Sequence, residues 1–429
     1  MKILLKNVSL LNPDQKLDKK ADLLIENGKI SEIGSIELDE KDGKVFDLEG
    51  NYCVPGLFDM HVHLREPGRE DEETIETGSN SAAAGGFTGI ACMPNTDPAI
   101  DSAEIVRYII EKASHHLVDV YPIGAVSNER KGETLAPLLE LSKAGAVAFS
   151  DDGVAVKTSD LLRSALEYLK MVYAPLIEHC EDEALADGVM NEGAVSTELG
   201  VPGLPSVSED LIVMRDVLMA EYVGGKVHIA HISTKNSVEI VRSAKLKGIK
   251  VTAEVTPHHF TLVDESLRSY DTNLRMNPPL RTQEDVDAMI EGLKDGAIDV
   301  IASDHAPHSL EEKEYEFIYA PNGILGLETQ LGITLSELYH KKHLSLAEIV
   351  DKLSVNPRKI LGLPVPQIKV GEIANLTVFN PDEIWTVDVK KFLSKSKNTP
   401  FDKKLLTGKP TLTINNGQMF SQGKFESIV

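Results

Sequence analysis

Short apolar runs alternate with segments of helical periodicity through the middle of the chain. Four such runs, about as long as buried strands usually are, cover residues 54–58, 174–177, 227–230 and 298–302. A helical pattern follows each of the last three runs. Strand and helix units that repeat with right-handed crossovers form a parallel sheet, and this many units predict a closed (β/α)8 barrel of the TIM type.

The two ends of the chain show a different pattern, in which short β-like stretches are separated by turn signals such as Asn27-Gly28-Lys29. The stretches that we predict to be strands cover residues 2–8, 21–25, 44–48, 374–379, 410–414 and 418–422. We therefore predict an α/β protein with two domains. A small β-sandwich domain is built from residues 1–54 and 364–429, and the barrel domain spans residues 55–363.

Length and composition agree with this organisation and exclude some classes of partner. The chain of 429 residues is long enough for a barrel of about 250 residues and a smaller domain. Its net charge of −23 argues against a nucleic acid or an anionic membrane as partner. Because no run of about eighteen apolar residues exists and charges interrupt the first residues, we expect neither a membrane span nor a signal peptide. The three cysteines lack paired spacing, so we expect a cytoplasmic protein.

Two histidines, His61 and His63, directly follow the first apolar run of the barrel, and Asp59 precedes them. Side chains alternate between the faces of a strand, so Asp59 and both imidazoles would face one side and Val62 the other. Two neutral imidazoles at this spacing suit a divalent ion such as zinc. A surface pair or a hydrogen-bonded core pair would have the same spacing, so the motif alone leaves the three interpretations open.

Three further candidate ligands, His179, His231 and Asp304, stand at the ends of predicted barrel strands. In (β/α)8 barrels, catalytic residues gather at the carboxyl ends of the strands. These residues therefore favour the metal-site interpretation of the first two histidines.

Strand parity sorts the neighbouring histidines. His228 lies an odd number of residues before His231, so a regular strand would turn them to opposite faces. We select His231, at the carboxyl end, for the barrel mouth. His258 and His259 are adjacent and cannot both face inward, so we interpret them as structural.

Several segments carry a resemblance to a known family. They cover residues 59–68, 93–96, 150–153, 178–182, 231–234, 273–279 and 303–308. In sequence and order they resemble the amidohydrolase superfamily, and within it the bacterial dihydroorotases of the long, type I kind. The resemblance covers essentially the whole chain, and so many motifs in one order make it highly specific.

The resemblance implies a centre of two zinc ions. Its ligands are His61, His63 and Asp304 for one zinc, His179 and His231 for the second, and Asp152 as the bridge. Some type I members hold only one zinc firmly, so partial occupancy of the second site is an alternative.

The bridging residue separates type I dihydroorotases from other relatives. Many members of the superfamily bridge with a carboxylated lysine, but residues 147–153 contain no lysine, and type I dihydroorotases use an aspartate. This absence disfavours a dihydropyrimidinase, a hydantoinase or an allantoinase. Asp151 and Asp152 are adjacent and face opposite ways on an extended strand. Similarity to the family favours Asp152, with Asp151 as the alternative.

The implied activity is that of a zinc-dependent dihydroorotase. Such an enzyme reversibly cyclises N-carbamoyl-L-aspartate to L-dihydroorotate and water, the third step of de novo pyrimidine synthesis. A zinc-held water loses a proton near neutral pH, and Asp304 is our candidate for the group that moves this proton. An inactive partner of aspartate transcarbamoylase is a further alternative, but such homologues typically lose metal histidines that this chain retains. We predict a homodimer, and an association with aspartate transcarbamoylase stays open.

A substrate with a free carboxylate and a ring imide needs cations and amides around it. Arg65 would face the same side as His63 if the strand persists, and its guanidinium can hold a carboxylate by two hydrogen bonds. A surface salt bridge with Glu66 or Glu70 is the alternative. Where relatives usually have Pro-Phe-Gly, this chain has Pro321-Asn322-Gly323, so we expect a backbone contact to survive and a packing contact to be lost. The predicted substrate-binding residues are His63, Arg65, Asn95, Asn277, His308, Asn322 and Gly323.

Overall fold

Eight parallel strands form a barrel in the computed structural model, which describes residues 1–39 and 41–429. The barrel closes where the last strand meets the first, because Val62 pairs with His305 and the His63 N–H donates to the His305 carbonyl over 2.8 Å. The prediction of a (β/α)8 barrel is confirmed. In order around the barrel, the strands are β6 (Leu57–Val62), β7 (Phe87–Cys92), β8 (Asp119–Ala125), β9 (Ala148–Ser150), β10 (Leu176–Glu178), β13 (Val227–Ile229), β14 (Val251–Val255) and β15 (Val300–Ile301).

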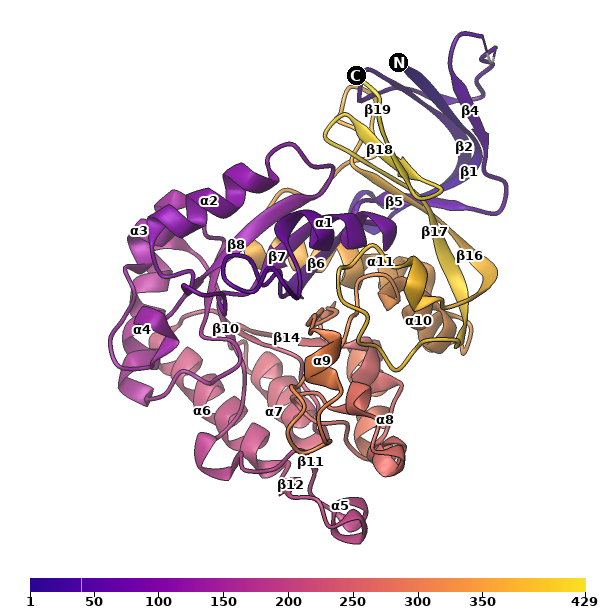
Figure 1. Ribbon diagram of the computed structural model, residues 1–429. Coiled ribbons are helices and arrows are strands. Elements are labelled where there is room, and N and C mark those ends of the chain that lie inside the picture. The colour runs from indigo at the N-terminus through magenta and orange to yellow at the C-terminus, as the bar shows by residue number, and fades with distance from the viewer. Residues whose placement is uncertain (40) are drawn as a thin grey trace.

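Helices surround the barrel (Figure 1). In five of the six longest helices that the structure describes, a Ser or Thr side chain at the N-cap accepts a backbone N–H of the first turn, which fixes where the helix begins. Their apolar faces share one large hydrophobic cluster with side chains of the barrel strands. The helices are α1 (Ile75–Ala84), α2 (Ala103–Ala113), α3 (Leu138–Ala144), α4 (Ser159–Val172), α5 (Ala194–Leu199), α6 (Val207–Val223), α7 (Lys235–Leu246), α8 (Gln283–Asp295), α9 (Leu310–Lys313), α10 (Gln330–Thr334), α11 (Leu346–Val350) and α12 (Asn356–Leu361).

The amino end of the barrel is filled. Phe58 at the start of β6 belongs to a separate cluster with Ile123 and Ile177. The Arg358 guanidinium from α12 lies 4.9 Å from the centre of the Phe58 ring and donates to the Gly56 carbonyl. The opposite, carboxyl end is where the candidate ligands lie.

Both chain ends meet in one nine-stranded sheet. β5 joins the two ends because it pairs with β1 on one side and β16 on the other. Leu5 and Ile25 share a core with Ile414 and Met419, so the sheet folds over on itself as a sandwich does. The strands are β1 (Lys2–Asn12), β2 (Leu17–Glu26), β3 (Lys29–Gly34), β4 (Lys44–Asp47), β5 (Tyr52–Pro55), β16 (Leu376–Thr386), β17 (Leu405–Asn415), β18 (Gln418–Ser421) and β19 (Lys424–Ser427).

The predicted terminal strands are confirmed, whereas the sequence pattern does not predict β3, β5 and β19. The domain limits of residues 1–54, 55–363 and 364–429 stay a prediction. The chain between β16 and β17 leaves the terminal sheet and runs past α10 toward the loops around α9 (Figure 1). Within the described residues, none of the helices has the length and apolar character needed to cross a membrane.

Close packing at the end of α1 leads to a first prediction. A Cβ atom added to Gly85 would lie 2.1 Å from the Leu327 carbonyl oxygen, whereas nothing lies within 4 Å of a Cβ added to Gly34. We therefore expect Gly85→Ala to lower the free energy of unfolding by about 1–3 kcal/mol, measured by thermal or denaturant unfolding. Gly34→Ala is the control and should change stability by no more than about 0.5–1 kcal/mol. Equal stability of the two variants would contradict this view of the packing.

Candidate metal centre and substrate cavity

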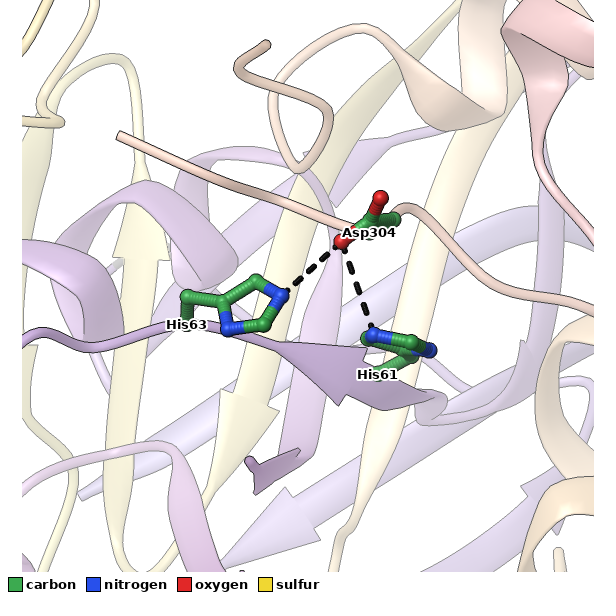
Figure 2. Close-up of side chains that lie close together, drawn as sticks. All are labelled: His61, His63 and Asp304. Atoms are coloured by element: carbon green, nitrogen blue, oxygen red, sulfur yellow. Dashed lines mark hydrogen bonds and ion pairs between the residues drawn. The ribbon is translucent and has the colours of Figure 1, made fainter. Parts of the chain in front are cut away.

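His61, His63 and Asp304 converge at the carboxyl end of the barrel (Figure 2). The Oδ1 atom of Asp304 lies 2.9 Å from Nε2 of His63 and 3.5 Å from Nε2 of His61. His61 belongs to β6, and Asp304 follows β15, so the first and last strands of the barrel build this group. The ligand atoms are close enough to one another to bind one metal ion.

Asp152 connects this group to two further histidines. Its Oδ1 atom lies 3.5 Å from Nε2 of His61, 3.7 Å from Nε2 of His231 and 3.8 Å from Nδ1 of His179. Its Oδ2 atom lies 3.6 Å from Nε2 of His63. The structure thus brings together all six of the side chains predicted as metal ligands.

This donor set fits a divalent metal ion. All six side chains are buried. Among the described residues, Nε2 of His61 and Oδ1 of Asp152 have no hydrogen-bond partner, although buried polar atoms usually have one. Imidazole nitrogens and carboxylate oxygens that face one another in this way are ligands that zinc prefers. The site can therefore hold a metal.

The pKa shifts of the two carboxyl groups and of His179 also suit metal binding. Burial acts to raise the pKa of the Asp304 carboxyl, but His61 and His63 outweigh it and hold that pKa below its usual range. Burial also acts to raise the pKa of the Asp152 carboxyl, but His61 and the other histidines outweigh it and hold this pKa well below its usual range. Burial and the neighbouring His231 lower the pKa of His179 to about 3. Ionised carboxylates and a neutral imidazole are the states in which these groups bind metals.

Two of the candidate ligands have a backbone conformation that is rare outside glycine. The φ angle is 48° at Asp304 and 27° at His231. Such conformations cost on the order of 1–3 kcal/mol and concentrate at functional sites. Because Asp304 follows β15 and His231 follows β13, these turns of the backbone aim both side chains at the barrel mouth.

Of the two adjacent aspartates, Asp151 lies outside the group of ligands. Its Oδ1 atom accepts the backbone N–H groups of Val126 and Ser127 over 2.9 and 3.0 Å, and its Oδ2 atom accepts the Ser127 hydroxyl over 2.5 Å. Asp151 thus fixes the loop after β8, and Asp152 is the aspartate that faces the histidines.

The expectation from strand parity is wrong for His228. β13 ends at Ile229, and the left-handed backbone of His231 breaks the alternation on which the expectation depends. His228 is fully buried, and its Nε2 atom lies 3.1 Å from Oε2 of Glu254. It therefore supports the ligand group instead of facing away from it.

Glu254 on β14 is a supporting residue that the motifs in the sequence do not reveal. Its Oε1 atom lies 2.6 Å from Nδ1 of His61. The His61 N–H donates to this carboxylate, so its Nε2 lone pair faces the other ligands. Burial acts to raise the pKa of the Glu254 carboxyl, but His61 and His228 lower it to about 2. An acidic residue inside the apolar run Val251–Val255 is the signal that could have identified it.

Asp59 also differs from its predicted position. β6 is irregular between Asp59 and Val62, so the side chains do not alternate simply. The Asp59 carboxylate accepts the backbone N–H groups of Ser303 and His61, each over 3.1 Å. Burial raises the pKa of this carboxyl to about 7. Asp59 ties the first barrel strand to the last and does not line the metal site.

His259 is held by two neighbours, as a structural residue would be. Its Nδ1 atom lies 2.7 Å from the Thr256 hydroxyl and its Nε2 atom 2.9 Å from the Pro278 carbonyl. His258 is buried beside it, with 4.5 Å between the ring centres.

A cavity of about 230 Å³ opens beside the metal ligands. Its lining includes every predicted substrate-binding residue, namely His63, Arg65, Asn95, Asn277, His308, Asn322 and Gly323. Asn95 also accepts the Nδ1 proton of His63 over 2.8 Å, and Nδ2 of Asn277 lies 3.4 Å from Nε2 of His179. A cavity of this size with converging polar groups suits a small polar molecule.

Arg65 reaches the cavity although β6 ends before His63. β6 ends at Val62, and the φ angle of Arg65 is 61°. Its guanidinium donates to the Pro307 carbonyl over 3.0 Å and lies 3.3 Å from Nε2 of His308. The condition that the strand persists is thus not met, but the guanidinium still lines the cavity.

The carboxylate that pairs with Arg65 is Glu72, not Glu66 or Glu70. Oε2 of Glu72 lies 3.1 Å from Nε of Arg65, and Glu72 is 2% exposed. Glu72, His308 and Glu312 have a spacing that would allow a metal. Arg65 and Arg69 already form ion pairs with the two carboxylates of this group. The guanidinium groups thus supply the positive charge that a metal ion would otherwise supply.

Comparisons with known proteins agree with this geometry. A family model described as "Dihydro-orotase-like" matches residues 50–237. The dihydroorotase of Syntrophus aciditrophicus is 50% identical over 428 residues, which cover 98% of this chain and 100% of that protein. The dihydroorotase of Acetivibrio thermocellus is 48% identical over 424 residues, which cover 98% and 99%. Among solved structures, the L-hydantoinase (dihydropyrimidinase) from Arthrobacter aurescens is similar with a TM-score of 0.87 and 26% identity, covering 100% of this chain and 97% of that one.

The support of His61 by Glu254 gives a second prediction. Glu254→Gln keeps the shape of the side chain but removes the charge that holds the His61 N–H. We expect metal binding to weaken about 10- to 100-fold, measured by metal titration of the chelator-treated protein. Glu178→Gln is a matched control, because Glu178 is equally buried but pairs with Arg215. Equal loss of metal affinity in both variants would contradict the role of Glu254.

Proposed function

This chain belongs to the dihydroorotase family, and we propose that it interconverts N-carbamoyl-L-aspartate and L-dihydroorotate at the metal centre of the barrel. It is an enzyme of the cyclic amidohydrolase type that acts on a small molecule. The observation that carries the proposal is the position of Asp152, whose Oδ1 atom lies within 3.8 Å of three imidazole nitrogens. Among the described residues that line the cavity there is no lysine, the residue expected at the bridge in other cyclic amidases.

The proposed centre contains two zinc ions. The ligands would be His61, His63 and Asp304 for one, His179 and His231 for the second, and Asp152 for both. The two groups of residues with metal-ligand spacing that share His61 support this assignment. When bound, zinc lowers the pKa of a water molecule from 15.7 to about 7 and polarises the carbonyl group that the water attacks.

Asp304 is the proposed proton carrier. Its Oδ1 atom faces His61 and His63, whereas Oδ2 points away from both imidazoles (Figure 2). In the hydrolytic direction, Oδ2 would take the proton of the attacking water and deliver it to the ring nitrogen that leaves. In the biosynthetic direction, the same atom would protonate the oxygen that departs as water. Asn95 and Glu254 keep His63 and His61 oriented during both steps.

The cavity residues are assigned to the polar groups of the substrate. The Arg65 guanidinium is the cation for the free carboxylate, with Asn95 and His308 beside it. Asn277 and the backbone of Asn322 and Gly323 lie on the same cavity and would face the ring amide. The Asn322 side chain accepts from Nε of Arg275 over 2.9 Å, so it would not supply the packing contact that a phenylalanine makes.

Further properties remain predictions from the sequence. They are a homodimer and a cytoplasmic location. An association with aspartate transcarbamoylase and partial occupancy of the second zinc site stay open as alternatives.

The proposed chemistry predicts that Asp304 and Asp152 are both essential. In zinc-replete protein, the wild type should interconvert dihydroorotate and N-carbamoyl-L-aspartate in both directions and leave hydantoin, dihydrouracil and allantoin unchanged. Asp304→Asn should lower kcat by about 10²- to 10⁴-fold because the proton carrier is lost. Asp152→Ala should lower both activity and the zinc bound per chain. Activity that persists in both variants would contradict the mechanism.

The proposed role of Arg65 predicts a change in substrate affinity. Arg65→Lys keeps the positive charge but loses the planar pair of donors, and hydrogen bonds to charged groups contribute about 1.5–3 kcal/mol. We expect KM for dihydroorotate to rise about 10- to 100-fold. Arg69→Lys is the control, because Arg69 also pairs with Glu72 but does not line the cavity. A similar KM in the two variants would argue against carboxylate binding by Arg65.

A further inference from the structure

A short stretch of the connection between β16 and β17, residues 392–398, has an unusual pattern of burial. Ser394, Ser396 and Asn398 are 2%, 6% and 5% exposed, whereas Lys395 and Lys397 between them are exposed. Polar side chains are seldom so deeply buried unless they form hydrogen bonds. We call residues 392–398 the strap, because alternate polar side chains point from it into the barrel domain.

The two serines attach the strap to the loop that follows β6. The Ser394 hydroxyl donates to the Glu73 carboxylate, which also accepts the Lys395 N–H over 3.0 Å. The Ser396 hydroxyl donates to the Glu72 carbonyl over 2.7 Å. Glu72 is the carboxylate that contacts Arg65 and Nδ1 of His308. The strap therefore holds the backbone from which these contacts are made.

Asn398 reaches the two loops that form one wall of the substrate cavity. Its Oδ1 atom accepts the backbone N–H of His308 over 3.1 Å. Its Nδ2 atom donates to the carbonyls of Ala306 and Gly323 over 2.9 and 3.1 Å. The Asn398 carbonyl accepts the Leu325 N–H over 2.9 Å. Ala306, His308 and Gly323 all line the cavity.

These bonds set the distance between the two loops. One primary carboxamide supplies the acceptor and the two donors that three backbone groups require. An aspartate would present oxygens to the two carbonyls, and an alanine would leave three buried backbone groups without partners. Two direct bonds also join these loops: the Ala306 N–H donates to the Ile324 carbonyl over 2.8 Å, and Nε2 of His308 lies 2.7 Å from the Asn322 carbonyl. The Asn398 carboxamide adds three bonds to these two.

We propose that Asn398 is a positioning residue for substrate binding, which holds His308 and Gly323 at the separation that the substrate requires. The inference rests on the proposed function, in which these two residues face the substrate. Asn398 lies in the part of the chain that forms the terminal sheet, so that part contributes directly to the geometry of the substrate cavity. It does not contact the metal ligands, and its loss should leave the metal centre intact.

The test compares Asn398→Ala with Asn415→Ala. Asn415 on β17 is a matched control, because it is 2% exposed and its Nδ2 atom also donates to two backbone carbonyls, those of Thr88 and Leu117. It lies outside the lining of the cavity. The readouts are KM and kcat for dihydroorotate and N-carbamoyl-L-aspartate, zinc bound per chain and the unfolding temperature.

We expect Asn398→Ala to raise KM about tenfold or more, because a shift of about 1 Å in a positioning group can cost on the order of 100-fold. Zinc content should equal that of the wild type, and kcat should change much less than KM. Asn415→Ala should lower the unfolding temperature as much but leave KM unchanged. If Asn398→Ala does not give folded protein, the isosteric Asn398→Asp is assessed by the same readouts.

Unchanged KM in a folded Asn398 variant of an active enzyme would overturn the inference. An equal rise of KM in Asn415→Ala would overturn it as well, because the effect would then follow from lost stability alone. A zinc-replete wild type that turns over neither substrate would instead contradict the proposed function itself. The two failures are therefore distinguishable.

Discussion

The burial of two carboxylates among four imidazoles is the constraint on which the rest of this structure depends. Asp152 and Asp304 are 3% and 7% exposed, and an ion without compensation at such a position costs several kcal/mol. Divalent cations bound by these side chains would offset this cost. The pKa of Asp304 lies below its usual range although burial opposes the change, because His61 and His63 face its carboxylate. A divalent metal that binds these side chains would therefore stabilise the barrel mouth that brings them together.

A residue of the candidate site could be predicted from the sequence where a local pattern places it, and could not where a tertiary contact places it. His61 and His63 could be predicted because a strand carries them to the barrel mouth, and Arg65 because it follows closely. The role of His228 could not, because parity holds only while the strand is regular, and the chain turns at His231. The support of His61 by Glu254 could not be predicted from the sequence either, because the two residues are distant in the sequence and only closure of the sheet brings them together. Local patterns identify the ligands, whereas their supports depend on tertiary contacts.

The part of the chain that contains the terminal sheet also contributes contacts to the substrate cavity of the barrel. Its predicted strands follow from alternation and turn signals, but the strap between β16 and β17 has no such pattern that points to the cavity. Ser394, Ser396 and Asn398 become informative only when their burial is known. Through Glu72 and Glu73, the strap is bonded to the segment that carries Arg65, and through Asn398 to the segment that carries His308. Two of the side chains proposed for the substrate carboxylate, Arg65 and His308, thus depend on a distant part of the chain, since Asn398 lies 90 residues beyond His308.

In the proposed function, the choice between reactions within this fold depends on the side chain that would bridge the two metals, Asp152. A barrel with a TM-score of 0.87 to an L-hydantoinase does not by itself distinguish a dihydroorotase from its relatives. An aspartate is much shorter than a carboxylated lysine, so its backbone must lie closer to the histidines. The Arg130 guanidinium binds the carbonyls of Asp151 and Asp152, and Asp151 binds the loop after β8. These contacts hold the backbone where a short side chain reaches all four imidazoles. A lysine at this position would extend past them, and a change of bridge would require a change in this loop as well.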